Sequence, residues 1–138
     1  MPYKGCEKII NTDLLEIQIA SMVNRERAKA GLPPLTPDYN LSGIARLKSG
    51  DMRLHNYCGH QSPVYGSPFD MLVKFGVDYR HAGENVAMGY GTREAVMNGW
   101  MESPGHRNNI LNDDYKKIGV GVVTDSYRTV YWTQLFVA

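Results

Sequence analysis

The chain has 138 residues and a formal net charge of +1, with 15 Lys plus Arg against 14 Asp plus Glu. This length predicts one domain, and the near-neutral charge argues against a dedicated nucleic-acid binder, which usually carries a basic stripe. The 43% hydrophobic and 21% charged composition is typical of a folded chain, and no apolar run approaches the ~18 residues of a transmembrane helix.

The first part of the chain predicts an arm and a helix. Residues 1–11 show a weak pattern and are interpreted as an N-terminal arm, followed by a single domain over 12–138. Asp13 and Glu16 would lie in the first helical turn, where the helix dipole favours carboxylates. The helix would end before Gly31. Its expected buried stripe is Leu15, Ile19, Met22 and Val23, and its expected solvent side is Arg25, Glu26, Arg27 and Lys29.

A turn over 35–38 is expected to lead into a second helix. This helix would begin at about Asn40 and fade near Asn56. Helical spacing puts several apolar residues and one lysine stem on its inner face. These residues are Leu41, Ile44, Ala45, Met52 and the aliphatic part of Lys48.

The middle of the chain, residues 57–90, is rich in Gly, Ser, Pro and Tyr and predicts loops around one short helix over 68–75. Ser67 would cap that helix, with Pro68 at its first position. A short strand is expected over 84–88 and a third main helix from near Thr92. The sequence Ser103-Pro104-Gly105 would interrupt this helix before one further turn over 106–111.

The last third of the chain predicts two strands. Ile118, Val120 and Val122 alternate with smaller residues, which is a period-two signal. A second β-rich run covers 129–137, and residues 125–128 would form the hairpin turn between them. Because helices come first and strands last, the expected fold class is α+β rather than a doubly wound parallel sheet.

Three segments contain candidate functional residues. His60 precedes Ser-Pro in a turn, Glu84 stands among small and apolar residues, and His106 follows Ser-Pro-Gly. Each has a structural alternative: a histidine bonding its own loop or turn, or a buried glutamate accepting backbone hydrogen bonds. The separations of 24 and 22 residues match no local metal motif. Spacing alone therefore does not bring the three together.

A catalytic nucleophile among the cysteines and serines is a weaker hypothesis. Cys58 and His60 form a Cys-x-His pair, but a half-buried thiol is the preferred interpretation because no third orienting residue is evident. Ser62 or Ser103 beside a histidine would resemble a hydrolase pair, yet there is no Gly-x-Ser-x-Gly elbow. The two cysteines, Cys6 and Cys58, are too few for a disulfide scaffold and leave one bridge open.

The order of the motifs is more specific than any one of them. The chain closely resembles the bacterial branch of the CAP superfamily (cysteine-rich secretory, antigen 5 and pathogenesis-related proteins, or SCP domains) from about Asp13 to the C-terminus. The residues that carry this resemblance are Met22–Arg27, His60–Pro63, Gly66–Asp70, Gly83–Ala87, Trp100–Leu111 and Ile118–Gly121.

The resemblance implies an α-β-α sandwich with a small, mainly antiparallel sheet between helical layers. It also implies that His60, Glu84 and His106 converge in an open cleft. In many relatives the two histidines bind a divalent ion, often zinc. Two neutral imidazoles suit Zn²⁺, and a nearby carboxylate can orient a bound water.

The sequence departs from the family pattern in the site. Many eukaryotic relatives have a glutamate three positions after the helix tryptophan, where this chain has Ser103. Glu102 lies one position earlier, about 100° around the helix, so it is expected to point away while Ser103 stands in for the acid. The segment Tyr57-Cys58-Gly59-His60 is smaller than the bacterial pattern, and the disulfides of eukaryotic relatives are absent.

Family resemblance does not fix a reaction. The leading hypothesis is a non-enzymatic binding module whose cleft holds a divalent metal, with an envelope component, a protein or a lipid as its ligand. One alternative is a metal-assisted hydrolase with Glu84 as general base, and another is a lipid or sterol binder lined by Tyr57, Tyr65 and Tyr90. No signal peptide is recognisable, so an extracellular or cell-envelope location is implied by the family alone.

Overall fold

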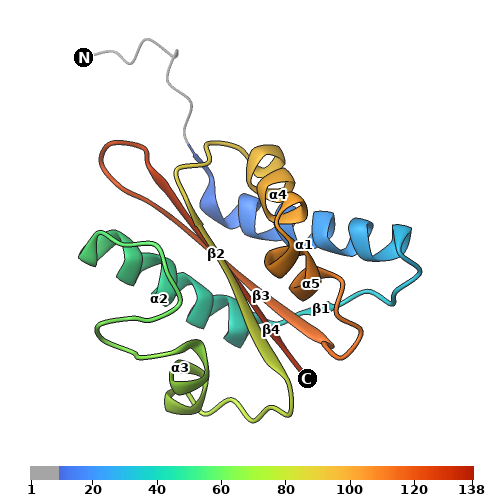
Figure 1. Ribbon diagram of the computed structural model, residues 1–138. Coiled ribbons are helices and arrows are strands. Elements are labelled where there is room, and N and C mark those ends of the chain that lie inside the picture. Colours follow the sequence, from blue (N-terminus) through green and yellow to red (C-terminus); the bar gives the residue numbers. More distant parts are fainter. Residues whose placement is uncertain (1–9) are drawn as a thin grey trace.

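The computed structural model describes residues 10–138, which form three layers with a sheet in the middle (Figure 1). Helices α1, α4 and α5 cover one face of the sheet, and α2 and α3 cover the other. The predicted α+β class and the sandwich are therefore confirmed. The helices are α1 (Thr12–Lys29), α2 (Tyr39–His55), α3 (Pro68–Lys74), α4 (Arg93–Glu102) and α5 (Pro104–Ile110).

The sheet has four strands in the order β1-β3-β4-β2. The strand bounds are β1 (Thr36–Pro37), β2 (Ala82–Met88), β3 (Lys117–Thr124) and β4 (Val130–Val137). The long strands pair antiparallel, and only the two-residue β1 runs parallel to its neighbour β3. The sequence predicted a plain turn at β1, because two residues are too short to show a period. Residues 1–9 of the predicted arm, and Cys6 with them, lie outside the described residues.

Local signals account for most element ends. The Asn11 side chain caps α1 by accepting from the Leu14 N–H, and α1 ends just before Gly31, which has a φ of 75°. Ser67 and Asp70 form a capping box at the start of α3, with Pro68 at the first helical position as predicted. No helix within residues 10–138 is long and apolar enough to cross a membrane.

The prediction that Arg27 faces solvent is wrong, because its side chain is fully buried. Its Nε donates to the Pro33 carbonyl, and its Nη1 donates to the carbonyls of Ile110 and Asn112, each at 2.9 Å. The end of α5 leaves carbonyls without helical partners, and a guanidinium satisfies several of them at once. The buried position of Arg27 thus ties the end of α1 to the end of α5.

Two glycines of β3 set the distance between the sheet and α2. A Cβ built on Gly119 would lie 2.3 Å from the Leu41 carbonyl carbon, and one on Gly121 would lie 2.1 Å from the Arg46 nitrogen. Both are backbone atoms of α2, so no side chain fits at either position. The alternating partners, including Val120, face α1 and α4 instead. The alternation in the sequence of β3 therefore puts glycines on the face that touches the α2 backbone and larger apolar side chains on the face covered by α1 and α4.

Candidate functional site

The candidate site lies at β2, the edge strand of the sheet. Glu84 pairs with Leu135, whose side chain packs with α2 and α3, so Glu84 faces that layer. The next residue, Asn85, faces the opposite layer, where its Nδ2 donates to the His106 carbonyl of α5 at 3.1 Å. Because successive side chains of β2 point to opposite faces, Glu84 faces the layer of α2 and α3, whereas Asn85 faces α5.

Glu84 and His60 are in direct contact. The Nδ1 of His60 lies 2.8 Å from Glu84 Oε1, which fits a ring N–H donating to a carboxylate. The Glu84 side chain is 1% exposed, whereas that of His60 is 57% exposed. The hydrogen bond with Glu84 raises the pKa of His60, against the smaller lowering effect of burial. Within residues 10–138, Glu84 Oε2 is buried without a hydrogen-bond partner.

His106 occupies the other side of the edge strand, on α5. Its Nδ1 lies 2.9 Å from the Ser103 Oγ at the start of that helix. Burial lowers the pKa of His106, and the charge of His60 lowers it further. The Asn109 side chain donates to the Glu84 carbonyl at 3.1 Å and fastens α5 to β2 next to the acid.

The structure joins His60 to Glu84 and His106 to Ser103, and neither pair contacts Glu102 by a hydrogen bond within the described residues; the meeting of the two pairs in one cleft stays a prediction. The Glu102 side chain is exposed, as its rotation by one helical position predicts. The other two histidines have different neighbours. His55 Nε2 lies 3.4 Å from Asp51 Oδ1, and His81 Nδ1 lies 4.0 Å from Asp114 Oδ2. Among the described residues, no three His, Cys, Asp or Glu side chains are grouped so that they could hold a metal ion.

The side chains considered as nucleophiles have other surroundings. The Ser62 Oγ donates to Asp51 at 2.6 Å rather than to a histidine. Cys58 is an exposed residue rather than the predicted half-buried one, and partial desolvation of its thiol still raises the pKa, which disfavours the reactive thiolate. The pairing of Cys58 with Cys6 stays untested, because Cys6 lies outside the described residues.

Two buried charges beside the site escaped the sequence analysis. The ammonium of Lys48 is buried along with its stem, and Asp51 is buried one helical turn further along α2. Lys48 Nζ donates to the His60 carbonyl at 2.9 Å. The signal was present, because Lys48 shares a helix face with Leu41, Ile44 and Ala45, and a charge on such a stripe points to a polar contact.

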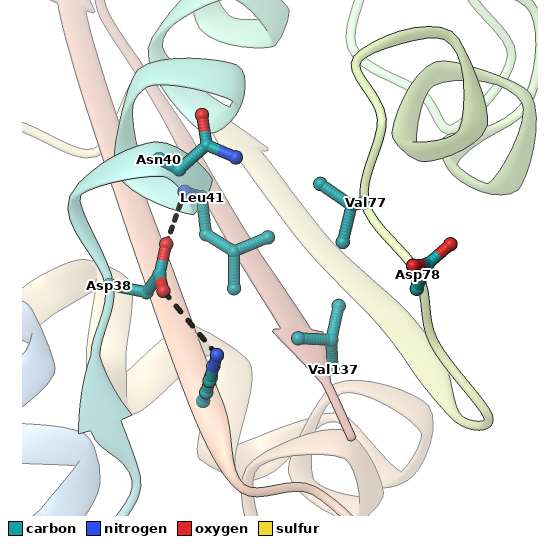
Figure 2. A pocket seen from close by; sticks show the side chains of 7 residues that line it. Asp38, Asn40, Leu41, Val77, Asp78 and Val137 are labelled. Carbon is teal, nitrogen blue, oxygen red and sulfur yellow. Dashed lines mark hydrogen bonds and ion pairs between the residues drawn. The ribbon is translucent and has the colours of Figure 1, made fainter.

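Two hollows of the described surface are lined by residues other than His60 and His106. One of about 210 Å³ opens between the start of α2 and the ends of β3 and β4, where Asp38 both caps α2 and faces Lys117 (Figure 2). Another of about 430 Å³ runs along α2 beside Val64 and Tyr65. The second hollow is lined by His55, and neither hollow is lined by His60 or His106.

An α-β-α sandwich with two histidines and a buried glutamate at an edge strand defines a class of domain that known proteins share. The sequence model of the cysteine-rich secretory protein family, CAP, matches residues 20–136. The chain therefore belongs to the CAP family, and the resemblance seen in the motifs is confirmed. The exact domain start at residue 12 stays a prediction.

Relatives from bacteria agree with this assignment. The chain is 51% identical over 122 residues to the uncharacterized protein YkwD and 41% identical to the uncharacterized membrane protein YlbC, both of Bacillus subtilis. These alignments cover 88% of this chain but 46% and 34% of the relatives. The chain thus spans less than half the length of these curated relatives.

Solved structures match the fold over nearly the whole chain. An extracellular protein containing an SCP domain from Bacillus anthracis has a TM-score of 0.85 at 31% identity, covering 95% of this chain and 45% of that one. An outer surface protein of Borrelia burgdorferi also has a TM-score of 0.85, at 23% identity, covering 93% of this chain and 95% of that one. The second likeness, at this identity, concerns the fold alone.

Proposed function

We propose that the chain is a non-enzymatic binding module in which His60 and His106 hold one divalent metal ion, most suitably zinc. The observation that carries this proposal is the use of the ring nitrogens. Each imidazole commits its Nδ1 to the protein, one to Glu84 and the other to Ser103. With both Nδ1 atoms donating, to Glu84 and to the Ser103 Oγ, both Nε2 atoms are left for a ligand, and this division of roles is usual for metal-binding histidines.

The donor chemistry suits a weakly held, open metal. Imidazole nitrogen is a normal zinc ligand, and a carboxylate on the far nitrogen makes the ring a better donor. Since no three His, Cys, Asp or Glu side chains are grouped as metal ligands in the described part of the chain, the other ligands of an ion held by the two histidines would be water or the bound partner. A catalytic zinc usually has three protein ligands, which favours partner binding over catalysis.

The surroundings of Glu84 do not favour its use as the general base of a hydrolase. A general base must reach the proton that it removes. One oxygen of Glu84 is engaged by His60, and the other is buried. Glu84 is better suited to orient His60 than to activate a water above the surface.

The lipid-binding alternative has less support from the tyrosines named for it. The Tyr57 hydroxyl donates to Asp51, and the Tyr65 ring packs 5.8 Å from that of Phe75. These contacts engage Tyr57 and Tyr65 within the domain, whereas Tyr90 is 40% exposed. A location outside the cell or at its envelope is part of the proposal, because the Bacillus anthracis relative is described as extracellular. The partner would be an envelope component, a protein or a lipid of that compartment.

Zinc calorimetry on purified protein tests the proposal. We expect the wild type to bind one zinc per chain and the His60→Ala/His106→Ala variant to show no measurable binding. His81→Ala is the matched control, because His81 contacts Asp114 instead of the site, and it should bind like the wild type. Equal zinc affinity in the double variant and the wild type would refute the metal centre. Metal-dependent turnover of a peptide, ester or glycan library that disappears in Glu84→Gln would favour the hydrolase instead.

A further inference from the structure

The segment that carries His60 has little regular structure of its own. It leaves α2 at Asn56, which is in the left-handed conformation with a φ of 54°. Ser62 and Gly66 then exchange two backbone hydrogen bonds. Between these points, residues 58–61 lie outside helices and strands, and their backbone N–H groups make no backbone–backbone hydrogen bond within the described chain. The position of His60 must therefore depend on side chains.

The first of these side chains is Lys48. It is 1% exposed, and its Nζ donates to the carbonyl of His60 itself at 2.9 Å. The same ammonium lies 5.1 Å from the centre of the Tyr57 ring, so it also contacts the start of the segment. A buried ammonium is costly unless it is compensated. The charges of Glu84 and Asp51 supply that compensation, and both oppose the lowering of the Lys48 pKa by burial.

The second side chain is Asp51, one turn further along α2. Its carboxylate accepts from the Tyr57 hydroxyl and, at 2.6 Å, from the Ser62 Oγ. Ser62 Oγ in turn accepts from the N–H groups of Val64 and Tyr65 at 3.0 and 2.9 Å. Asp51 thus holds both flanks of the segment, while Lys48 holds its centre.

We propose that Lys48 and Asp51 form a clamp that positions His60 for metal binding, with Lys48 as the principal positioning residue. This inference rests on the proposed function for its metal readout. The physical reason is preorganisation, since a two-ligand site gains affinity when its donors need not be ordered on binding. Without the clamp, the exposed His60 ring would lose its fixed approach to the buried Glu84, and only the His106 half would stay in place.

The decisive variant is Lys48→Met, which keeps length and apolar volume but removes the ammonium. Lys29→Met is the matched control, because Lys29 is an exposed surface residue of α1 paired with Glu26. Two readouts are needed. One is the imidazole nitrogen chemical shifts of His60 and His106 in metal-free protein, and the other is zinc affinity by calorimetry.

We expect Lys48→Met to shift the His60 imidazole signals away from those of the Glu84-bonded ring and to leave the His106 signals unchanged. Zinc affinity should fall by about 10- to 100-fold, as for other residues that orient metal ligands. Lys48→Arg, which keeps the charge and the donor, should recover part of both effects. Lys29→Met should change neither readout.

A folded Lys48→Met protein with wild-type His60 signals and wild-type zinc affinity would overturn the clamp. If Lys48→Met does not fold, Ser62→Ala takes its place, because it removes only the hydroxyl that Asp51 holds. Unchanged His60 signals in Ser62→Ala would then overturn the clamp, and shifted signals would support it. If the wild type binds no zinc, the proposed function fails, while the metal-free chemical shifts still decide whether the clamp exists.

Discussion

The two histidines of the site are held in different ways. His106 lies on α5, where the Asn85 amide donates to the His106 carbonyl and the buried Arg27 donates to the Ile110 carbonyl at the end of the helix. His60 lies on an irregular segment, where two charged side chains of α2, Lys48 and Asp51, provide the contacts. One half of the site is thus supported by regular structure and the other by a small buried polar network.

This difference indicates what each half depends on. The His106 half depends on the layer of α1, α4 and α5, because Arg27 connects α1 to the end of α5. The His60 half depends on α2, whose height above the sheet is set by the glycines of β3. Substitutions in the two layers should therefore separate the two halves, and the following tests are ordered from the largest expected effect to the smallest.

The largest loss of stability is expected for Gly121→Ala, which places a new methyl group against the backbone of α2. The new Cβ would lie 2.1 Å from the Arg46 nitrogen, a backbone atom that cannot turn aside. We expect the free energy of unfolding to fall by about 3 kcal/mol, at the upper end for overpacking, because all of α2 must shift. Urea denaturation followed by circular dichroism measures this loss.

The control for Gly121→Ala is Gly43→Ala on α2 itself. A Cβ at Gly43 meets no atom within 4 Å, so a helical alanine there should stabilise the protein by about 0.5–1 kcal/mol. Similar stabilities for the two alanine variants would mean that the close approach of α2 to β3 does not constrain this domain.

Arg27→Met tests the layer formed by α1, α4 and α5. It leaves the carbonyls of Pro33, Ile110 and Asn112 without the guanidinium that now serves them. We expect a loss of about 2 kcal/mol in unfolding free energy, because buried acceptors left unpaired are costly. Arg25→Met, at an exposed position of the same helix, should change stability by less than about 0.5 kcal/mol. A harmless Arg27→Met would show that the end of α5 does not need this cap.

The sequence predicted the regular half of the molecule better than the polar half. The helix ends at Asn11 and Ser67 and the period of β3 follow from local chemistry, so those elements appeared where capping and alternation put them. The family motifs picked out His60, Glu84 and His106, and the structure places them at the two sides of β2. Local pattern alone gave no reason for them to meet.

The buried charges could not be predicted in the same way. Arg27 lies four positions after Val23, on the buried face of α1, but its charge suggested a surface residue, and its acceptors include carbonyls more than 80 positions away along the chain. Lys48 and Asp51 acquire their roles only when the segment after α2 folds back over that helix. Periodicity could indicate that Arg27 and Lys48 are buried, but the partners of these charges are set by tertiary structure, which periodicity does not encode.

The smallest effect is a difference in titration between the two histidines. In metal-free protein His60 should titrate above the ordinary value of 6.5, because the Glu84 carboxylate favours its charged form, and His106 below that value, because burial disfavours the charge. A raised folded pKa means that the His60 contribution to stability is complete below about pH 6.5 and is lost as the pH rises through the folded pKa. A lowered folded pKa means that the His106 contribution to stability is present above about pH 6.5 and is lost as the pH falls through the folded pKa.

NMR titration of the two imidazoles measures these pKa values directly. Glu84→Gln removes the carboxylate charge, so the pKa of His60 should fall towards its ordinary value, while that of His106 should stay below its own. The gap between the two pKa values should then narrow, mainly because the pKa of His60 falls, and the weaker charge of His60 should also lower the pKa of His106 less. A wild-type protein in which His106 titrates at the higher pH, or a Glu84→Gln variant in which the gap is unchanged, would contradict this assignment of the two halves.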